Sequence, residues 1–230
     1  MPLTSKERLL AKHFSQYVSE HKKEFIEKVL SQRTRHVTVA LEDIYQSQNA
    51  SAVVRTCECM GLQDIHIIEN TSSYQTNTRV LKGSNKWMDL IRYRKKGVNN
   101  TEACIRQLKE SGYTIYAADP AEEGISIHDI DIVAGKTAIL FGNELHGVSN
   151  HALAQCDHKV RIPMYGFTES LNISVSVAIC LNTLINKLHQ GPWEKYGLGE
   201  DEKEELTLQW YRKVVRKSDL LEREFLRTIQ

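Results

Sequence analysis

The sequence predicts an α/β protein with a mostly parallel sheet and helices on both faces of that sheet. Short apolar runs of strand length alternate with longer segments whose apolar residues recur at helical spacing. The run Ala138–Phe141 is apolar throughout, as expected of a central strand that is buried on both faces. One predicted helix ends at Gly61 and another is directly followed by Gly112, positions where glycine favours termination. With 230 residues, the chain can form one sizeable domain with appendages.

The predicted elements follow a regular order. Two helices occupy the first 35 residues, and Thr4 or Ser5 caps the first of them. The predicted strands cover residues 37–41, 65–68, 88–94, 113–117, 137–141 and 159–162. The predicted helices among and after them cover residues 49–61, 101–111, 150–155 and 171–188. We therefore divide the chain into an N-terminal helical extension (1–36), an α/β domain (37–190) and a C-terminal helical extension (191–230).

Composition favours a cytoplasmic protein without a membrane segment. No apolar run approaches the ~20 residues of a membrane helix, and the charged N-terminus has no signal-peptide core. The five cysteines form no CxxC pair and no metal-ligand spacing, so we expect reduced thiols and no metal site.

The charge distribution leaves two interpretations open. The net charge is only +1, which by itself argues against a nucleic-acid partner. However, residues 1–36 carry eight Lys or Arg against four Glu, and residues 79–96 carry seven against one Asp. Trp87 and Tyr93 lie within the second stretch. Such a pattern suits phosphate contact with base stacking, or equally an edge strand protected by lysines.

Three stretches contain candidate functional residues. In the first, Asn49 to Thr56, Asn49 is a good helix N-cap and Arg55 follows almost two turns later. The second, Phe141 to Ser149, is a loop in which Gly142 and Gly147 would allow a ligand to approach the backbone. Because Gly147 is followed by Val-Ser, the loop is not a phosphate-binding Walker loop.

The third stretch, Ile162 to Val175, runs from a strand end at Pro163 into a long helix. Asn172 near the helix start suits a cap, and the Gly-x-Ser-x-Gly pattern of a serine hydrolase is absent. Each stretch alone has a plain structural explanation.

Together, in this order, the three stretches resemble the SPOUT superfamily of trefoil-knotted RNA methyltransferases. The matching residues are Asn49 and Arg55, then Gly142-Asn-Glu-Leu-His-Gly147, then Ile162-Pro-Met-Tyr-Gly166 and Ser170-Leu-Asn-Ile-Ser-Val175. The similarity is greatest to the branch that methylates ribose 2'-hydroxyls. Residues 30–36 and the late helix around Trp210 look like the TrmH-type tRNA guanosine-2'-O-methyltransferases.

The resemblance implies a deep trefoil knot in the C-terminal part of the domain, S-adenosylmethionine (SAM) as cofactor, a homodimer, and tRNA as partner. The implied target is the D-loop guanosine at position 18. The implied catalytic residues are Asn49, Arg55, Glu144, Ser170 and Asn172. The implied cofactor-binding residues are Leu140, Gly142, Gly147, Ile162, Met164 and Leu171. The expected RNA-binding residues are Arg8, Arg33, Arg35, Lys82 and Lys86.

Three points stay open. A ribosomal RNA methyltransferase of the same superfamily and a catalytically silent RNA-binding member are the alternatives. Some members carry His before the asparagine, where this chain has Gln48, so an imidazole role in guiding RNA is not expected. His146 next to the loop's second glycine is either an acid–base group or an ordinary loop residue.

Overall fold

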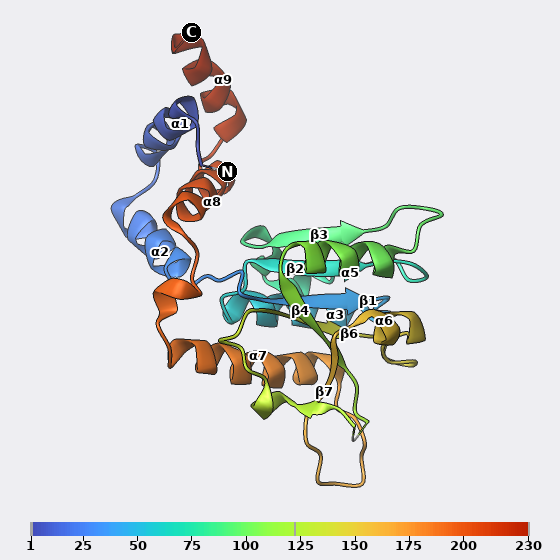
Figure 1. Cartoon of the computed structure of the whole chain (residues 1–230). Helices are drawn as coiled ribbons and strands as arrows, with labels where there is room; N and C mark the ends of the chain where they lie inside the picture. Colours follow the sequence, from blue (N-terminus) through green and yellow to red (C-terminus); the bar gives the residue numbers. More distant parts are fainter. Residues whose placement is uncertain (1, 122, 230) are drawn as a thin grey trace. The chain divides into compact units, whose positions relative to one another are not determined.

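Seven parallel strands form one sheet in the order β3-β2-β1-β6-β4-β7-β5 (Figure 1). The computed structural model describes residues 2–121 and 123–229. The strands are β1 (Val37–Glu42), β2 (Asp64–Ile68), β3 (Asp89–Tyr93), β4 (Tyr113–Ala118), β5 (Ile125–Ser126), β6 (Lys136–Phe141) and β7 (His158–Arg161). Every strand predicted from the sequence is present, and the parallel α/β class is confirmed. The two-residue strand β5 was not predicted.

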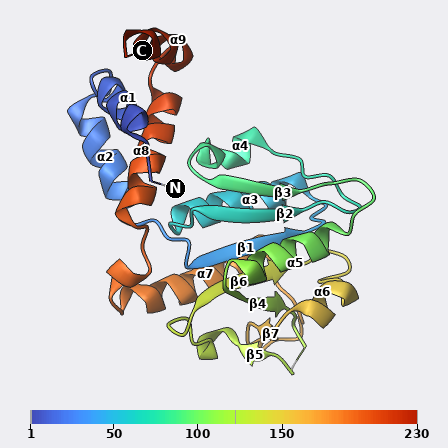
Figure 2. The same cartoon turned by 45° about the horizontal axis from the view of Figure 1, so that its top comes forward.

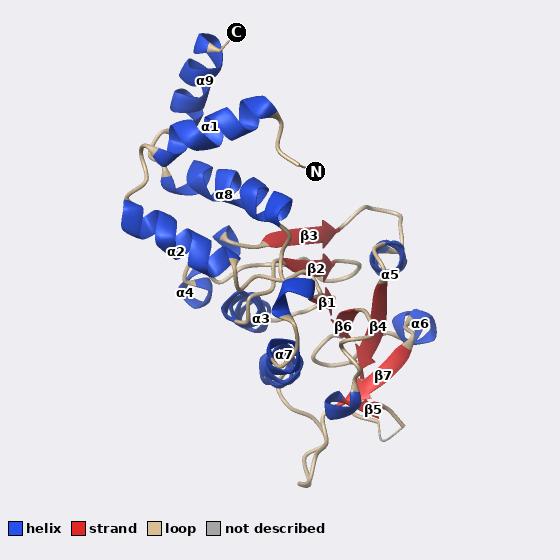
Figure 3. Ribbon diagram, turned by 60° about the vertical axis from the view of Figure 1, so that its left-hand side comes forward, coloured by secondary structure: helices blue, strands red, loops and turns tan. Residues whose placement is uncertain are grey.

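Helices cover both faces of the sheet (Figure 3). Helices α3 (Ser47–Cys59) and α7 (Ile173–His189) lie on one face, and α5 (Asn100–Glu110) and α6 (Asn150–Gln155) on the other. Side chains alternate between the two faces along each strand, so the central strands contribute side chains to two separate hydrophobic cores. On β6, Ile139 and Phe141 belong to the core with α3 and α7, whereas Ala138 and Leu140 belong to the core with α5 and α6.

The register of the central pair places two functional loops side by side. Strand β1 pairs with β6 so that Leu41 lies opposite Phe141. Both strands run in the same direction and end at the same edge (Figure 2). The segment after β1 and the loop after β6 therefore begin next to each other, although about 100 residues separate them in sequence. Ligands of open parallel sheets bind at this edge.

Five further α-helices lie in the described residues, four of them toward the ends of the chain. These are α1 (Ser5–Ser15), α2 (Glu20–Leu30) and α8 (Glu200–Val214), with α9 (Ser218–Thr228) after them; the short α4 (Thr78–Leu81) precedes β3. The described residues also form three 3-10 turns, at Ser84–Lys86, Ile127–Asp129 and Trp193–Lys195. Thr4 caps α1 as predicted and forms a capping box with Glu7. The sequence did not predict α4 or α9.

The chain divides into two compact units, and the first of them is discontinuous in sequence. It contains the described residues up to Arg33 together with those from Gly197 onward, and the second contains Thr34–Tyr196. Helix α1 packs on α8 and α9, and α2 packs on α8. We expected two separate extensions, whereas their helices pack into one helical unit.

Arg33 belongs to the core of this helical unit, which contradicts its expected role in RNA binding. It is 1% exposed, and its guanidinium lies 5.6 Å from the ring centre of Trp210, itself 2% exposed. A cation packed against an indole face is stabilised there by the ring's electrons. The buried guanidinium is not accessible to a phosphate, so we assign Arg33 to packing.

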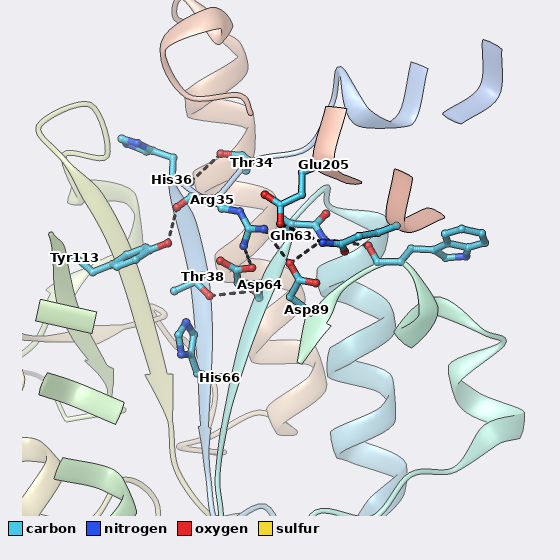
Figure 4. A network of polar contacts seen from close by, with 12 residues as sticks. Thr34, Arg35, His36, Thr38, Gln63, Asp64, His66, Asp89, Tyr113 and Glu205 are labelled. Atoms are coloured by element: carbon cyan, nitrogen blue, oxygen red, sulfur yellow. Dashed lines mark hydrogen bonds and ion pairs between the residues drawn. The ribbon is translucent and has the colours of Figure 1, made fainter. Parts of the chain in front are cut away.

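Arg35 is likewise a structural residue (Figure 4). Its guanidinium forms ion pairs with Asp64, at the start of β2, and with Asp89, at the start of β3; the second distance is 2.8 Å. The hydroxyl of Tyr113 donates to its backbone carbonyl at 2.6 Å. Two carboxylates therefore neutralise the charge that the sequence suggested for RNA, and these ion pairs favour a structural role for Arg35.

The basic stretch at residues 79–96 is partly neutralised in the structure. Arg92 donates two hydrogen bonds of 2.8 Å to Glu69, and the ring of Tyr93 is 9% exposed, so neither is free for RNA. Lys82 and Lys86 are exposed beside the edge strand β3. These two lysines keep their expected role as candidate phosphate contacts.

The five cysteines are free thiols, and three of them, Cys57, Cys104 and Cys180, are buried. Burial raises the pKa of Cys180 to about 12. None of the described helices combines the length and apolar character required to cross a bilayer. Within residues 2–121 and 123–229, no group of three His, Cys, Asp or Glu side chains is arranged to hold a metal ion.

The Arg35 network yields the first prediction. Arg35→Ala leaves Asp64, whose side chain is 9% exposed, without its cation. We expect the free energy of unfolding to fall by about 2–3 kcal/mol, below the range for fully buried pairs because the Arg35 side chain is 29% exposed. Urea denaturation measures this, with the exposed Arg94→Ala as the control that should change little. Unchanged stability combined with weaker RNA binding in Arg35→Ala would restore the original expectation.

Candidate active site

A cavity of about 750 Å³ opens at the carboxyl edge of the sheet. Its walls come from the ends of β4, β6 and β7, from the loops that follow them, and from the first turns of α3 and α7. The cavity collects nine of the eleven residues expected to act in catalysis or cofactor binding: Asn49, Gly142, Glu144, Gly147, Ile162, Met164, Ser170, Leu171 and Asn172. Three segments distant in the sequence therefore meet at one cavity.

Two of the expected residues lie elsewhere. Leu140 is fully buried in the core beneath α5 and α6, and its neighbour Phe141 lines the cavity instead. Arg55 is exposed on α3 and is not part of the cavity wall. Six residues of helix separate it from Asn49, which corresponds to about 9 Å along the axis and a different face. No described residue forms a hydrogen bond or ion pair with the guanidinium of Arg55.

The loop after β6 is closed on itself. The backbone amide of Asn143 donates to the carbonyl of Gly147 at 2.9 Å, and the amide of Gly147 donates back at 2.8 Å. Gly142 lies directly beneath this closure. A Cβ atom there would lie 2.0 Å from the carbonyl carbon of Gly147, so only glycine fits. Gly147 has φ +67°, the left-handed region that favours glycine. Both glycines predicted to shape this loop thus have a defined geometric reason.

Glu144 fastens this loop to the beginning of α3. Its carboxylate accepts hydrogen bonds from the backbone amides of Tyr45, at 3.0 Å, and Gln46, at 3.2 Å. It accepts a third, at 3.0 Å, from the side-chain amide of Asn49. Gln46 is the N-cap of α3, so a carboxylate lies at the positive end of the helix.

The hydrogen bonds also determine the charge state of Glu144. Burial raises the pKa of this carboxyl group, but donation from Asn49, Tyr45 and Gln46 lowers it more, and the pKa lies below its usual value. Glu144 is therefore ionised at neutral pH and already accepts several donors. It is better suited to hold neighbouring groups than to accept a proton.

Asn49 is not the N-cap of α3, as the sequence suggested, because the helix begins at Ser47. Asn49 lies in the first turn, 8% exposed, with its side chain directed to other motifs. Its amide donates to Glu144, and its carbonyl oxygen accepts from the amide of Asn172 at 3.1 Å. Asn172 caps α7 as predicted, accepting from the backbone amide of Ser174 at 2.9 Å. A continuous polar chain, Glu144–Asn49–Asn172, thus joins the three motifs.

The segment between β7 and α7 forms a long loop that protrudes from the sheet (Figure 1). Ser170 and Met164 in this loop line the cavity, while Tyr165 and Phe167 are fully exposed. Ser170 is itself exposed, so its hydroxyl is accessible to a ligand.

Three charged residues of the cavity wall were missed by sequence reasoning: Asp119, Arg161 and Glu169. Asp119 directly follows β4, and Arg161 ends β7. Both could have been found from the rule that ligands bind at the carboxyl ends of parallel strands. Together with Glu144, the wall carries three carboxylates and one arginine, and Asp119 is already paired with Lys159 at 3.1 Å.

The state of Glu144 gives a prediction for the pH dependence of stability. Because its folded pKa lies below the unfolded value of about 4.3, ionised Glu144 stabilises the fold above that pH, and the contribution is lost as the pH falls through the folded pKa. The stability difference between wild type and Glu144→Gln should therefore be largest at neutral pH and shrink below pH ~4.3. Urea titrations from pH 7 to 3 measure it.

The exposed Glu169 provides the control, since it accepts no hydrogen bond from any described residue. Glu169→Gln should leave the stability profile close to that of wild type. A wild-type advantage over Glu144→Gln that stays constant or grows on acidification would contradict the assignment of Glu144.

Comparison with known proteins agrees with this geometry. Residues 36–182 match the model of the SpoU rRNA Methylase family. A protein of Borreliella burgdorferi named tRNA (guanosine(18)-2'-O)-methyltransferase is 43% identical over 90% of this chain and 92% of its own length. The crystal structure of the TrmH/SpoU tRNA modifying enzyme of A. aeolicus superposes with a TM-score of 0.75 at 27% identity, covering 86% of this chain and 98% of that one.

A more distant structure, an AdoMet-bound rRNA methyltransferase from Sinorhizobium meliloti, shares the fold with a TM-score of 0.59 at 21% identity, covering 68% of this chain and 58% of that one. The family model spans all three motifs that meet at the cavity, and the B. burgdorferi protein matches nearly the whole chain. The chain belongs to the SpoU rRNA methylase family.

Proposed function

We propose that this protein transfers the methyl group of SAM to the ribose 2'-hydroxyl of guanosine 18 in tRNA. The observation that carries the proposal is the polar chain Glu144–Asn49–Asn172, which brings three motifs of a methylase family together at one cavity. The B. burgdorferi relative, named for this activity, matches nearly the full length of the chain. The family's description refers to ribosomal RNA, which is therefore the alternative substrate.

The cavity fits the proposed cofactor. Its volume of about 750 Å³ lies in the range of sites for cofactors and drug-sized ligands. Gly142 and Gly147 expose the backbone of the loop, so donors and acceptors of the main chain can bind a polar ligand. SAM carries a sulfonium and an ammonium group against one carboxylate, and Glu144 and Glu169 on the cavity wall complement that net positive charge. Ile162, Met164 and Leu171 supply apolar contact area.

SAM supplies a methyl group that is already activated, so the protein's task is to align the attacking hydroxyl and to stabilise the charge that develops on it. Alignment alone can contribute about 7–11 kcal/mol. Ser170 and Asn172 lie at the cavity mouth as hydrogen-bonding groups for the ribose or the cofactor. Asn49 holds Asn172, and Glu144 holds Asn49. Glu144 acts in this arrangement as an ionised anchor.

Arg55 acts, in this proposal, as a fixed cation. A guanidinium keeps its proton in proteins and is a poor proton acceptor, whereas it binds phosphate through two parallel hydrogen bonds. Its exposure leaves it accessible to an RNA phosphate. It lies outside the cavity of one chain, and we propose a homodimer with the active site near the interface. The apolar helix α7 would supply part of that contact.

The remaining expectations are proposals of the same kind. Exposed Lys82 and Lys86 would contact tRNA phosphates, and so would Arg8, whose exposed side chain forms a 3.0 Å ion pair with Glu204. A surface ion pair of this kind is weak enough to exchange for a phosphate. The deep trefoil knot and a cytoplasmic location are proposed from the family resemblance.

Methyl transfer to defined RNAs tests the proposal. Wild-type protein incubated with labelled SAM and unmodified tRNA transcripts should give one 2'-O-methylated nucleotide, guanosine 18. Ribosomal RNA fragments serve as the competing substrate, and a transcript with a 2'-deoxyguanosine at position 18 serves as the matched control. Methylation of ribosomal RNA alone would select the alternative, and SAM binding without transfer to either RNA would indicate a silent binding module.

Variants of Arg55 distinguish two roles for this residue, a cationic clamp on an RNA phosphate and a general base. Lysine deprotonates with a pKa of ~10.4 but cannot form the planar two-pronged contact. As a clamp, Arg55→Lys and Arg55→Ala should both lose about 10²–10³ in single-turnover rate at every pH from 6 to 9.5. The exposed Arg94→Ala is the control. A lysine variant that regains the wild-type rate at high pH would contradict the clamp, and normal turnover in Arg55→Ala would remove Arg55 from catalysis.

A further inference from the structure

One buried carboxylate near the cavity has no part in the mechanism above. Glu42 is the last residue of β1, and its side chain is almost inaccessible, with the residue 4% exposed. A carboxylate is rarely buried unless several hydrogen bonds compensate for the loss of water. The position of Glu42, at the carboxyl end of a central strand, is where ligand sites of parallel sheets form. The hydrogen bonds that Glu42 accepts indicate its role in the structure.

Glu42 joins two helices across the edge of the sheet. One carboxylate oxygen accepts from the hydroxyl of Thr101 in α5, at 2.6 Å, and from the hydroxyl of Ser149, at 2.8 Å. The other oxygen accepts from the backbone amide of Ser149, at 2.9 Å. Both carboxylate oxygens thus accept hydrogen bonds from Ser149, and one of them also accepts from Thr101.

Ser149 connects this carboxylate to the cavity. It is the N-cap of α6, where its hydroxyl also accepts from the backbone amide of Ala152 at 3.2 Å. Its neighbours Val148 and Asn150 both line the cavity, as does Leu153 in the first turn of α6. A shift of Ser149 would therefore move one whole wall. Thr101 and its helix contribute nothing to the cavity wall.

We infer that Glu42 is a positioning residue for the cofactor site, which acts through Ser149 to hold the wall Val148–Leu153 in its binding position. The inference rests on the proposed use of SAM. Glu144 fixes the start of the same loop from the α3 side, and Glu42 fixes its end from the β1 side. The loop between them, closed by the Asn143–Gly147 pair, then keeps one shape. A preorganised wall binds its ligand without a further ordering penalty.

The structure provides a matched pair of variants. Ser149→Ala and Thr101→Val each remove one hydroxyl that donates to the same oxygen of Glu42. Only the first of these hydroxyls bears on the cavity wall. We expect Ser149→Ala to weaken SAM binding about tenfold, which is about 1.4 kcal/mol, because it removes the hydroxyl that donates to the charged Glu42 and caps α6. Thr101→Val should lower the melting temperature and leave SAM affinity within twofold of wild type.

Two further variants and two readouts complete the test. Glu42→Gln turns one acceptor into a donor and should also weaken SAM binding about tenfold. Ser149→Thr keeps the hydroxyl that Ser149→Ala removes, so its SAM affinity should be close to that of wild type. Calorimetry gives the dissociation constants for SAM, and single-turnover rates at saturating SAM should stay within threefold of wild type for all variants. The change would thus appear in KM and not in kcat.

Two results would overturn the inference. In one, Ser149→Ala and Thr101→Val lower the melting temperature but leave SAM affinity equally unchanged, so that Glu42 is purely structural. In the other, both variants weaken SAM binding to the same degree, so that the effect does not pass through Ser149. Absence of SAM binding by the wild-type protein would instead refute the proposed function.

Discussion

The site depends on one long-range contact, the hydrogen bonding of the Glu144 carboxylate to the start of α3. Glu144 follows β6, and its donors Tyr45, Gln46 and Asn49 follow β1, so the contact joins segments almost 100 residues apart. Parallel pairing of β1 with β6 brings the two strand ends together, and the carboxylate fastens them. Without an anion at this position, the backbone amides of Tyr45 and Gln46 would lose their acceptor and the side-chain amide of Asn49 would lose the group that orients it. Asn172, and with it the start of α7, depends on Asn49 in turn.

This dependence separates what the sequence could reveal from what it could not. Strand and helix periodicity is a local property, and the predicted strands and the main helices of the sheet domain were correct within a few residues. Thr4 and Asn172 were recognised as caps because capping is also local. Asn49 was assigned as a cap by the same reasoning, incorrectly, because α3 begins at Ser47 and the side chain of Asn49 donates instead to Glu144 from a distant loop. Only the fold makes that partner available.

The arginines before β1 also have partners that only the fold brings near them. In the sequence, Arg33 and Arg35 belong to a basic stretch that suggests RNA, and nothing nearby neutralises them. In the structure, their partners are Trp210 for the first and Asp64 and Asp89 for the second. Lys82 and Lys86 beside β3 differ from these arginines in that their side chains are exposed. Charge in a sequence indicates a nucleic-acid surface only where the fold leaves it uncovered.

The discontinuous helical unit has a consequence for synthesis of the chain. Helices α1 and α2 are made first, but α8 and α9, on which α1 packs, are made last. The 163 residues from Thr34 to Tyr196 are translated in between, which takes roughly 8–33 s at typical rates of 5–20 residues per second. The sheet domain thus has time to fold while α1 and α2 wait for their partners. A chain that ends at Tyr196 would contain every residue that lines the cavity but would lack α8 and α9, the helices on which α1 packs.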